Sequence, residues 1–145
     1  MQPQDKVLEL GSGTGYVTVC LCRLGGEVVG IEPDPDLAAA ARQHLSELGC
    51  TGVKVLELDP LAGPAPGGPF DAIAVLGSLP SEADLGPLER QLAVGGRLFG
   101  IVGEPPVMGA HLVTRVGPQD FRRERLFETS AAPLVLAPRV PDFVF

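Results

Sequence analysis

Short apolar runs and amphipathic segments alternate along the first hundred residues of the chain. The apolar runs have the length of strands, and in the segments between them apolar residues recur every three or four positions. The predicted strands cover residues 7–10, 27–32, 53–57, 70–76 and 97–102. This alternation predicts a Rossmann-like, doubly wound α/β fold with a mostly parallel sheet.

Helices are predicted after the first, second and fourth strands. The second of them has the clearest start, because Asp34 is a good N-cap and Pro35 suits the first helical position. Glycines follow the first two helices as C-terminal caps. The apolar positions on the three helices are Val17, Cys20, Leu21 and Leu24, then Leu37, Ala41, Leu45 and Leu48, and finally Leu85, Leu88 and Leu92. Residues 62–69 are dense in Gly and Pro and predict a loop.

The last part of the chain changes from this alternation to strands alone. Residues 103–109 are too short and too rich in Pro and Gly to form a helix. Residues 112–116 and 121–127 predict an antiparallel hairpin around Gly117-Pro118. The fold class is therefore α/β, with a C-terminal antiparallel hairpin, and we expect residues 1–145 to form a single domain.

The most informative segment is Glu9-Leu10-Gly11-Ser12-Gly13-Thr14-Gly15, at the end of the first predicted strand. Gly11 and Gly13 allow a ligand to approach the backbone closely, because no Cβ intervenes. We expect Gly15 to let the next helix pack tightly on the sheet. The free N–H groups at a helix start can bind a polar or anionic group. A plain strand–turn–helix remains the alternative.

The spacing of these glycines separates two kinds of nucleotide site. A dinucleotide site needs G-x-G-x-x-G, whereas here the third glycine comes one residue earlier. The carboxylate of Glu9 also suits a ligand with an ammonium group better than a pyrophosphate. Glu32, at the end of the second strand, stands where Rossmann-like folds bind ribose hydroxyls. A solvated acid at a strand end is the alternative for Glu32.

In this order the motifs resemble those of class I S-adenosylmethionine-dependent methyltransferases. The resemblance rests on the glycine segment, Glu32, Asp59 and the two strands near residues 70–73 and 92–98. It implies S-adenosyl-L-methionine as the cofactor. Its methionine part would lie at Gly11, Ser12, Gly13 and Gly15, near Glu9. The ribose would lie at Glu32 and the adenine near Asp59.

The C-terminal half resembles one branch, the protein-L-isoaspartate O-methyltransferases, because it lacks a helix before the hairpin and carries the pattern of residues 114–127. This resemblance implies a protein or peptide that contains isoaspartate as the methyl acceptor. Two departures stand out. The family's N-terminal substrate-recognition segment has no counterpart before Lys6, and Pro60 replaces the usual glycine. We therefore expect cofactor binding but poor methylation of an isoaspartyl peptide.

Composition and charge limit the partners and the cellular location that the chain can have. The formal charge of −7 argues against a nucleic-acid partner, and no apolar run is long enough to span a membrane. The three cysteines cannot all form disulfides with one another, and we therefore expect a protein of the reducing cytoplasm. The spacing of Cys and His residues does not predict a metal site. No Ser/His/Asp or Cys/His pattern is present, and the catalytic residues stay unknown.

Three interpretations follow. The first is an S-adenosylmethionine-dependent O-methyltransferase of the isoaspartyl type. The second is a cofactor-binding module without independent catalysis. The third is an NAD-dependent oxidoreductase, which the G-x-G-x-G spacing and Glu9 disfavour.

Overall fold

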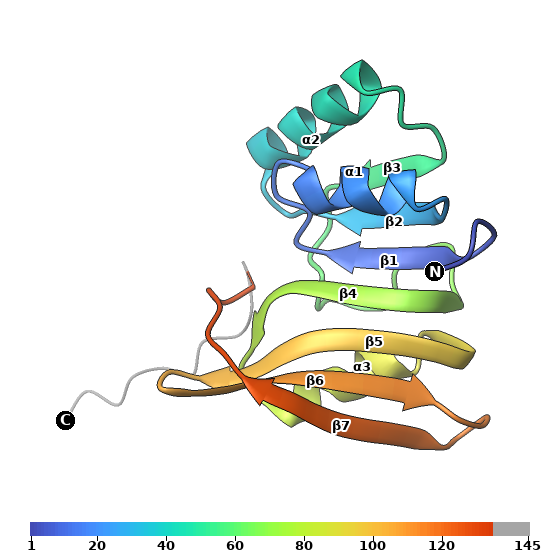
Figure 1. The fold of residues 1–145 in the computed structure, drawn as a ribbon. Coiled ribbons are helices and arrows are strands. Elements are labelled where there is room, and N and C mark those ends of the chain that lie inside the picture. Colours follow the sequence, from blue (N-terminus) through green and yellow to red (C-terminus); the bar gives the residue numbers. More distant parts are fainter. Residues whose placement is uncertain (135–145) are drawn as a thin grey trace.

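The computed structural model describes residues 1–134, and its strands form one seven-stranded sheet in the order β3-β2-β1-β4-β5-β6-β7 (Figure 1). The strands are β1 (Lys6–Leu10), β2 (Glu27–Ile31), β3 (Val53–Leu56), β4 (Phe70–Leu79), β5 (Leu92–Glu104), β6 (Val107–Arg115) and β7 (Phe121–Glu128). Strands β1 to β5 pair in parallel, and β6 and β7 pair antiparallel. The predicted fold class is confirmed. Residues 135–145 of the predicted domain lie outside the described part.

The helices cover different faces of the sheet. They are α1 (Tyr16–Arg23), α2 (Pro35–Glu47) and α3 (Leu85–Glu89), with a 3-10 helix at Glu82–Asp84 before α3. Glu9 of β1 contacts α1, whereas its neighbour Leu8 shares a core with Leu85 of α3. Because successive strand residues point to opposite faces, α1 and α3 lie on opposite sides of the sheet. Figure 1 shows α1 and α2 together on one side, and α3 behind β5 and β6.

The predicted helix faces are partly wrong. In α1 the buried side chain is Thr18, whereas Cys20 is exposed and Leu24 is 60% exposed. Leu48, at the C-cap of α2, is also exposed, and Ala38 is buried in its place. The apolar pattern ran one residue past each helix end, where the chain already leaves the sheet. The N-cap prediction is confirmed, because the Asp34 side chain accepts hydrogen bonds from the N–H groups of residues 36 and 37.

Strand β5 is longer than predicted, and it changes the C-terminal topology. Leu92, assigned to the third helix, begins this 13-residue strand. Gly95-Gly96 is not a turn before the strand but an irregularity inside it, between the pairs Phe70–Leu92 and Ala72–Arg97. A Cβ on Gly96 would lie 2.9 Å from the carbonyl oxygen of Phe70. After β5 the chain turns directly into β6, so three antiparallel strands form where one hairpin was expected.

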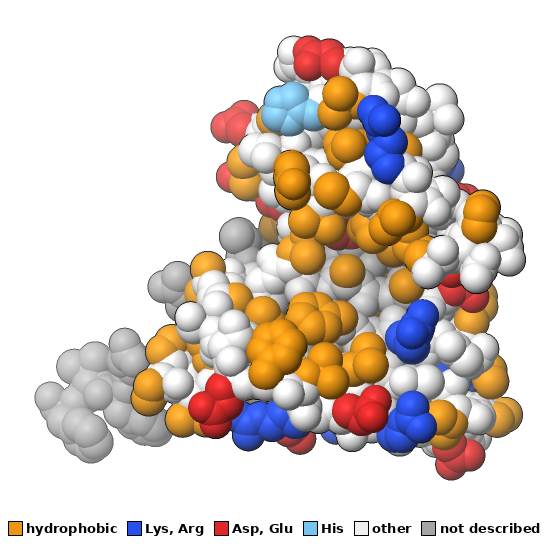
Figure 2. All heavy atoms as spheres, viewed as in Figure 1, with side chains coloured by type: hydrophobic (Ala, Val, Ile, Leu, Met, Phe, Trp, Pro, Cys, Tyr) orange, Lys and Arg blue, Asp and Glu red, His pale blue; other side chains and the backbone are white. Residues whose placement is uncertain are grey.

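The two faces of the sheet are covered unequally. On the α3 side, Leu8, Leu10, Ile73 and Leu98 belong to one large buried cluster. On the α1 side, apolar side chains of β5, β6 and β7 extend beyond α1 and α2. These are Phe99, Ile101 and Leu112, which are half-buried, and Phe127, which is 55% exposed. Figure 2 shows hydrophobic side chains gathered over this part of the sheet. We call these four residues the apolar face.

An ion pair fixes β7 to α3. Two guanidinium nitrogens of Arg123 donate to the two carboxylate oxygens of Glu89, over 2.5 and 2.9 Å. The Glu89 residue is only 4% exposed, so its carboxylate needs these bonds in place of water. The neighbouring Arg122 is 64% exposed in its side chain and lies 3.9 Å from Glu124.

Arg123→Met should lower the free energy of unfolding by about 2–4 kcal/mol, because it leaves a buried carboxylate without a partner. Arg122→Met, one residue away on the same strand, should change it by less than about 0.5 kcal/mol. Urea-induced unfolding of both variants measures the difference. Equal effects of the two substitutions would contradict the role given to the pair.

Candidate functional site

The segment between β1 and α1, residues 11–15, forms a loop that we call the glycine loop. Its three glycines have φ angles of +84° at Gly11, +55° at Gly13 and +93° at Gly15, a region that side chains with a Cβ rarely adopt. A Cβ on Gly15 would lie 3.2 Å from the Cα of Ala41 in α2. Gly15 therefore allows close packing of the loop against α2, a different contact from the packing of α1 on the sheet for which Gly15 was expected.

Gly11 and Gly13 have different surroundings. A Cβ on Gly11 would lie 2.9 Å from a methyl group of Leu134 and 3.0 Å from the carbonyl oxygen of Leu76. A Cβ on Gly13 would meet no atom within 4 Å. Gly11 is thus required by the packing of the C-terminal segment against β4, and open space for a ligand exists only at Gly13.

Glu32 lies beside the glycine loop, as its place at the end of β2 predicted. One of its carboxylate oxygens accepts the N–H of Gly13 over 2.9 Å, and the other accepts the N–H of Asp34 over 3.2 Å. The side chain is buried, at 2% exposure. The loop is also held to β2 directly, because the N–H of Gly11 donates to the carbonyl of Ile31. The two predicted motifs therefore meet at the carboxyl ends of β1 and β2.

Glu9 does not face the opening. It is fully buried under α1, where one carboxylate oxygen accepts the Thr18 hydroxyl over 2.5 Å. Burial raises the pKa of the Glu9 carboxyl, the Thr18 and Ser12 hydroxyls lower it, and the nearby charge of Glu32 raises it further. Ser12 is also buried, and its hydroxyl lies near enough to the carboxyl to lower that pKa but outside hydrogen-bond geometry. The second oxygen of Glu9 has no hydrogen-bond partner.

Asp59 lies apart from these residues, in the loop of residues 57–69. It is exposed, and its carboxylate accepts the N–H of Leu61 over 2.9 Å. A hollow of about 210 Å³ adjoins it, lined in part by Leu10, Ile31 and Pro60. The hollow reaches the ends of β1 and β2, so it connects Asp59 with the strands that carry the glycine loop and Glu32.

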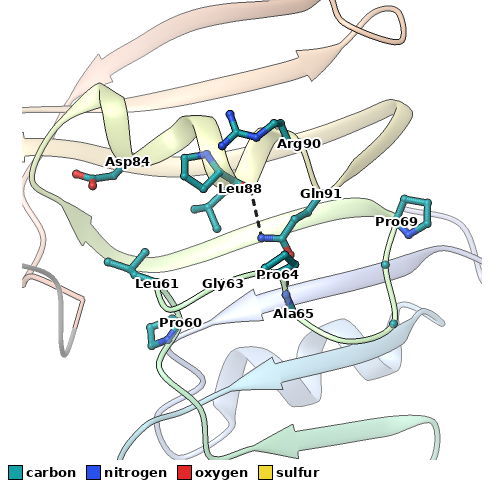
Figure 3. A pocket seen from close by; sticks show the side chains of 13 residues that line it. Pro60, Leu61, Gly63, Pro64, Ala65, Pro69, Asp84, Leu88, Arg90 and Gln91 are labelled. Atoms are coloured by element: carbon teal, nitrogen blue, oxygen red, sulfur yellow. Dashed lines mark hydrogen bonds between the residues drawn. The ribbon is translucent and has the colours of Figure 1, made fainter.

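A larger cavity of about 650 Å³ lies between the same loop and α3 (Figure 3). Leu61 and Pro64 line it from the loop, and Leu88, Arg90 and Gln91 from the other side. Gln91 holds the loop here, because its side-chain oxygen accepts the N–H of Ala65. None of the residues of the glycine loop lines this cavity, but it adjoins the hollow beside Asp59, because Pro60, Pro64 and Gln91 line both.

Sequence reasoning missed Thr18 and Leu134. Thr18 is a polar residue on the buried side of α1, four positions after Thr14, and its conflict with the apolar pattern of that helix was the available signal. Leu134 carries no local signal, because it reaches Gly11 across more than a hundred residues of chain. Within residues 1–134, no cluster of His, Cys, Asp and Glu is arranged to hold a metal ion. No helix in this part is long and apolar enough to cross a membrane.

Comparison with known proteins identifies the family. Residues 1–134 match the sequence profile described as protein-L-isoaspartate(D-aspartate) O-methyltransferase (PCMT). The chain belongs to this family. It is 40% identical over 134 residues to the protein-L-isoaspartate O-methyltransferase of Koribacter versatilis, across 92% of this chain and 59% of that protein. It is 39% identical to protein-L-isoaspartate O-methyltransferase 2 of Pelobacter propionicus, across 93% of this chain and 60% of that protein. The chain thus spans about 60% of the length of these relatives.

Solved structures of the PCMT family share the fold. A PCMT from Plasmodium falciparum, crystallised in complex with S-adenosyl-L-homocysteine, is 23% identical and has a TM-score of 0.77, across 92% of this chain and 66% of that chain. Another protein-L-isoaspartate O-methyltransferase is 25% identical with a TM-score of 0.79, across 89% of this chain and 41% of that chain. The resemblance found in the sequence is confirmed.

Gly11 and Gly13 of the glycine loop should respond differently to an added methyl group. Gly11→Ala should lower the free energy of unfolding by about 2–5 kcal/mol, because a left-handed residue is also forced against Leu134 and Leu76. Gly13→Ala should cost only the left-handed conformation, about 1–2 kcal/mol. Urea-induced unfolding of the two variants provides the measurement. A Gly13→Ala variant that is the less stable of the two would show that the loop packs differently.

Proposed function

We propose that this chain binds S-adenosyl-L-methionine at the carboxyl ends of β1 and β2 and acts as a protein-L-isoaspartate O-methyltransferase. The observation that carries the proposal is the hydrogen bond from Gly13 to Glu32, which joins the two sequence motifs into one site. Membership of the PCMT family supports it, as does the S-adenosyl-L-homocysteine bound to the P. falciparum relative.

The residues of this site fit such a ligand. Gly13 offers open space above the backbone, and Glu32 has carboxylate lone pairs beyond those that accept the two N–H groups. The buried and unpartnered oxygens of Glu9 and Ser12 lie next to the loop, as a site awaiting a polar ligand would have them. The hollow beside Asp59 offers room for a flat ring.

In the proposed site, each group of residues has one task. Glu32 accepts hydrogen bonds from the ribose hydroxyls. The methionine part lies at the open backbone of Gly13. Gly11, Ser12 and Gly15 shape the loop that holds it, and the charge of Glu9 lies near its ammonium group. Asp59 lies towards the exocyclic amine of adenine.

Methyl transfer to a carboxylate needs no side chain to activate either reactant. The cofactor supplies a methyl group that its sulfonium already activates, and an ionised carboxylate is already a nucleophile. The chain contributes alignment of the two groups and exclusion of water. We therefore assign no catalytic side chain.

We propose that the acceptor is an isoaspartyl residue in a protein or peptide, and that the protein acts in the cytoplasm. The family supports the acceptor, and three cysteines that form no disulfide among the described residues support the compartment. The net charge of −7 disfavours nucleic acid as a partner.

A second function, cofactor binding without independent catalysis, is favoured by the apolar face. Phe99, Ile101, Leu112 and Phe127 leave one side of the sheet without a cover in the described residues. An acceptor site that opens onto uncovered sheet would align its substrate poorly and leave it in water. The third interpretation, NAD binding, is disfavoured by the glycine spacing.

Isothermal titration should detect binding of S-adenosyl-L-homocysteine and no binding of NAD. Glu32→Ala should weaken the former by about 10- to 150-fold, which corresponds to 1.5–3 kcal/mol for hydrogen bonds to a charged group. Glu27→Ala, at the exposed opposite end of β2, is the matched control and should bind like the wild type. An affinity of Glu32→Ala within twofold of the wild type would refute the ribose assignment.

Methylation of an isoaspartyl peptide, measured with radiolabelled cofactor, distinguishes enzyme from binding module. We expect this chain to turn over the peptide very slowly although it binds the cofactor, because the described residues leave the apolar face without a cover. The same peptide with ordinary aspartate is the control. Robust turnover specific to isoaspartate would show that residues 1–145 already build the acceptor site.

A further inference from the structure

A polar cluster is buried between β1 and α1, directly under the glycine loop. Its centre is Glu9, which is fully buried, and its only hydrogen bond comes from the Thr18 hydroxyl. Thr18 is itself fully buried, in the middle of α1.

The sheet leaves room for this cluster. In the neighbouring strands, the residues paired with Glu9 are Gly30 and Ala74. A Cβ on Gly30 would lie 2.4 Å from the Ser12 hydroxyl and 3.4 Å from a carboxylate oxygen of Glu9. The small residues on either side therefore accommodate the acid and the serine.

The cluster lowers the stability of the fold. A buried carboxyl with one oxygen unpartnered loses its hydration without full compensation. An apolar side chain at residue 9 would fill the same place at lower cost. Other residues of this strand, Val7, Leu8 and Leu10, are of that kind. A buried acid directly under the glycine loop is therefore a functional candidate, and the group that holds it shares that function.

We propose that Thr18 is a positioning residue for the cofactor site: its hydroxyl holds the Glu9 carboxyl under the glycine loop as the negative charge that attracts the ligand's ammonium group. The inference rests on the proposed function and deepens it. Thr18 acts through Glu9 and does not touch the ligand, because both side chains are fully buried.

A pH dependence with two opposite signs follows. Burial raises the pKa of Glu9, so folding favours the protonated acid, and the stability of the fold declines as the pH rises through that pKa. The ligand's ammonium group favours the ionised form, so its affinity increases over the same range. A purely structural carboxyl would give the first dependence without the second.

The groups around Glu9 define the controls. From β2 it faces Glu32, whose charge raises the Glu9 pKa further. From α1, the glycine loop and β4 it faces Thr18, Ser12 and Ala74, none of which titrates. His44 of α2 contacts the glycine loop itself, with its ring nitrogen 2.8 Å from the carbonyl oxygen of Thr14. His44→Asn removes the imidazole while it keeps a side-chain N–H donor near the carbonyl.

The test measures the affinity for two ligands from about pH 5 to pH 8. One is S-adenosyl-L-homocysteine, which carries the ammonium group. The other is 5′-methylthioadenosine, which keeps adenine, ribose and sulfur but lacks the amino-acid part. Calorimetric titrations use the wild type, Thr18→Val, Thr18→Ser, Glu9→Gln and His44→Asn, with urea-induced unfolding of each at the same pH values.

In the wild type and in His44→Asn, the affinity for S-adenosyl-L-homocysteine should rise with pH while stability declines. In Thr18→Val the increase in affinity for S-adenosyl-L-homocysteine should occur at higher pH than in the wild type. At pH values below that increase, the variant should bind about tenfold more weakly than the wild type, the equivalent of one hydrogen bond to a charged group. Thr18→Ser should restore the wild-type profile, and Glu9→Gln should abolish the rise. The affinity for 5′-methylthioadenosine should not follow these changes.

The outcomes separate the inference from the proposed function. If Thr18→Val is less stable but keeps the wild-type pH profile, Thr18 is only structural and the inference is overturned. The same holds if Glu9→Gln keeps the rise, a result that does not depend on the folding of Thr18→Val. If the wild type binds neither ligand, the proposed function fails and the inference fails with it. If it binds both ligands without any dependence on pH, only the inference fails.

Discussion

The parallel pairing of β1 with β2 is the constraint on which the candidate site depends. Leu10 pairs with Ile31, so the two strands end at the same level and the next residues, Gly11 and Glu32, leave the sheet side by side. The loop then curves back until the N–H of Gly13 reaches the Glu32 carboxylate. A shift of one residue in this register would turn Glu32 to the other face and break that bond. The same pairing places Gly30 beside Glu9 and so provides the space for the buried acid.

Two buried glutamates show how differently this fold treats a charge. Glu89 has both oxygens bound by the guanidinium of Arg123, which satisfies the carboxylate and ties β7 to α3. Glu9 has only a neutral hydroxyl as a partner, and its second oxygen has none. The first arrangement stabilises the fold, whereas the second costs stability. An incompletely satisfied acid directly under a loop with open space at Gly13 is a candidate for a functional role, because its charge can attract a ligand at the loop without direct contact.

The sequence predicts those parts of the molecule that local rules control. The strands, the glycine loop, the Asp34 cap and the position of Glu32 follow from periodicity, from backbone freedom and from the place of strand ends. The sequence does not predict features that distant contacts decide. Gly11 was assigned to ligand approach, but Leu134 and Leu76 occupy the space above it. Gly95-Gly96 predicts a turn because glycine pairs usually mark one, yet both lie within a strand, where Gly96 is required by close contact with the backbone of Phe70 and Gly95 by its φ of +86°. The role of Thr18 does not follow from the sequence, because it depends on the contact with Glu9, which only the structure shows.

The apolar face connects the fold with the proposed methyl transfer. Strands β4 and β5 are apolar on both sides, the pattern of strands that are covered on both faces. The α3 side has such a cover, whereas Phe99, Ile101 and Leu112 on the α1 side have none in residues 1–134. In the proposed function, the cofactor lies at the ends of β1 and β2 and near Asp59, so its binding does not depend on that cover. The proposed methyl transfer also needs an acceptor that is aligned and shielded from water. On this proposal, binding and turnover are separable, because they rely on different parts of the same sheet.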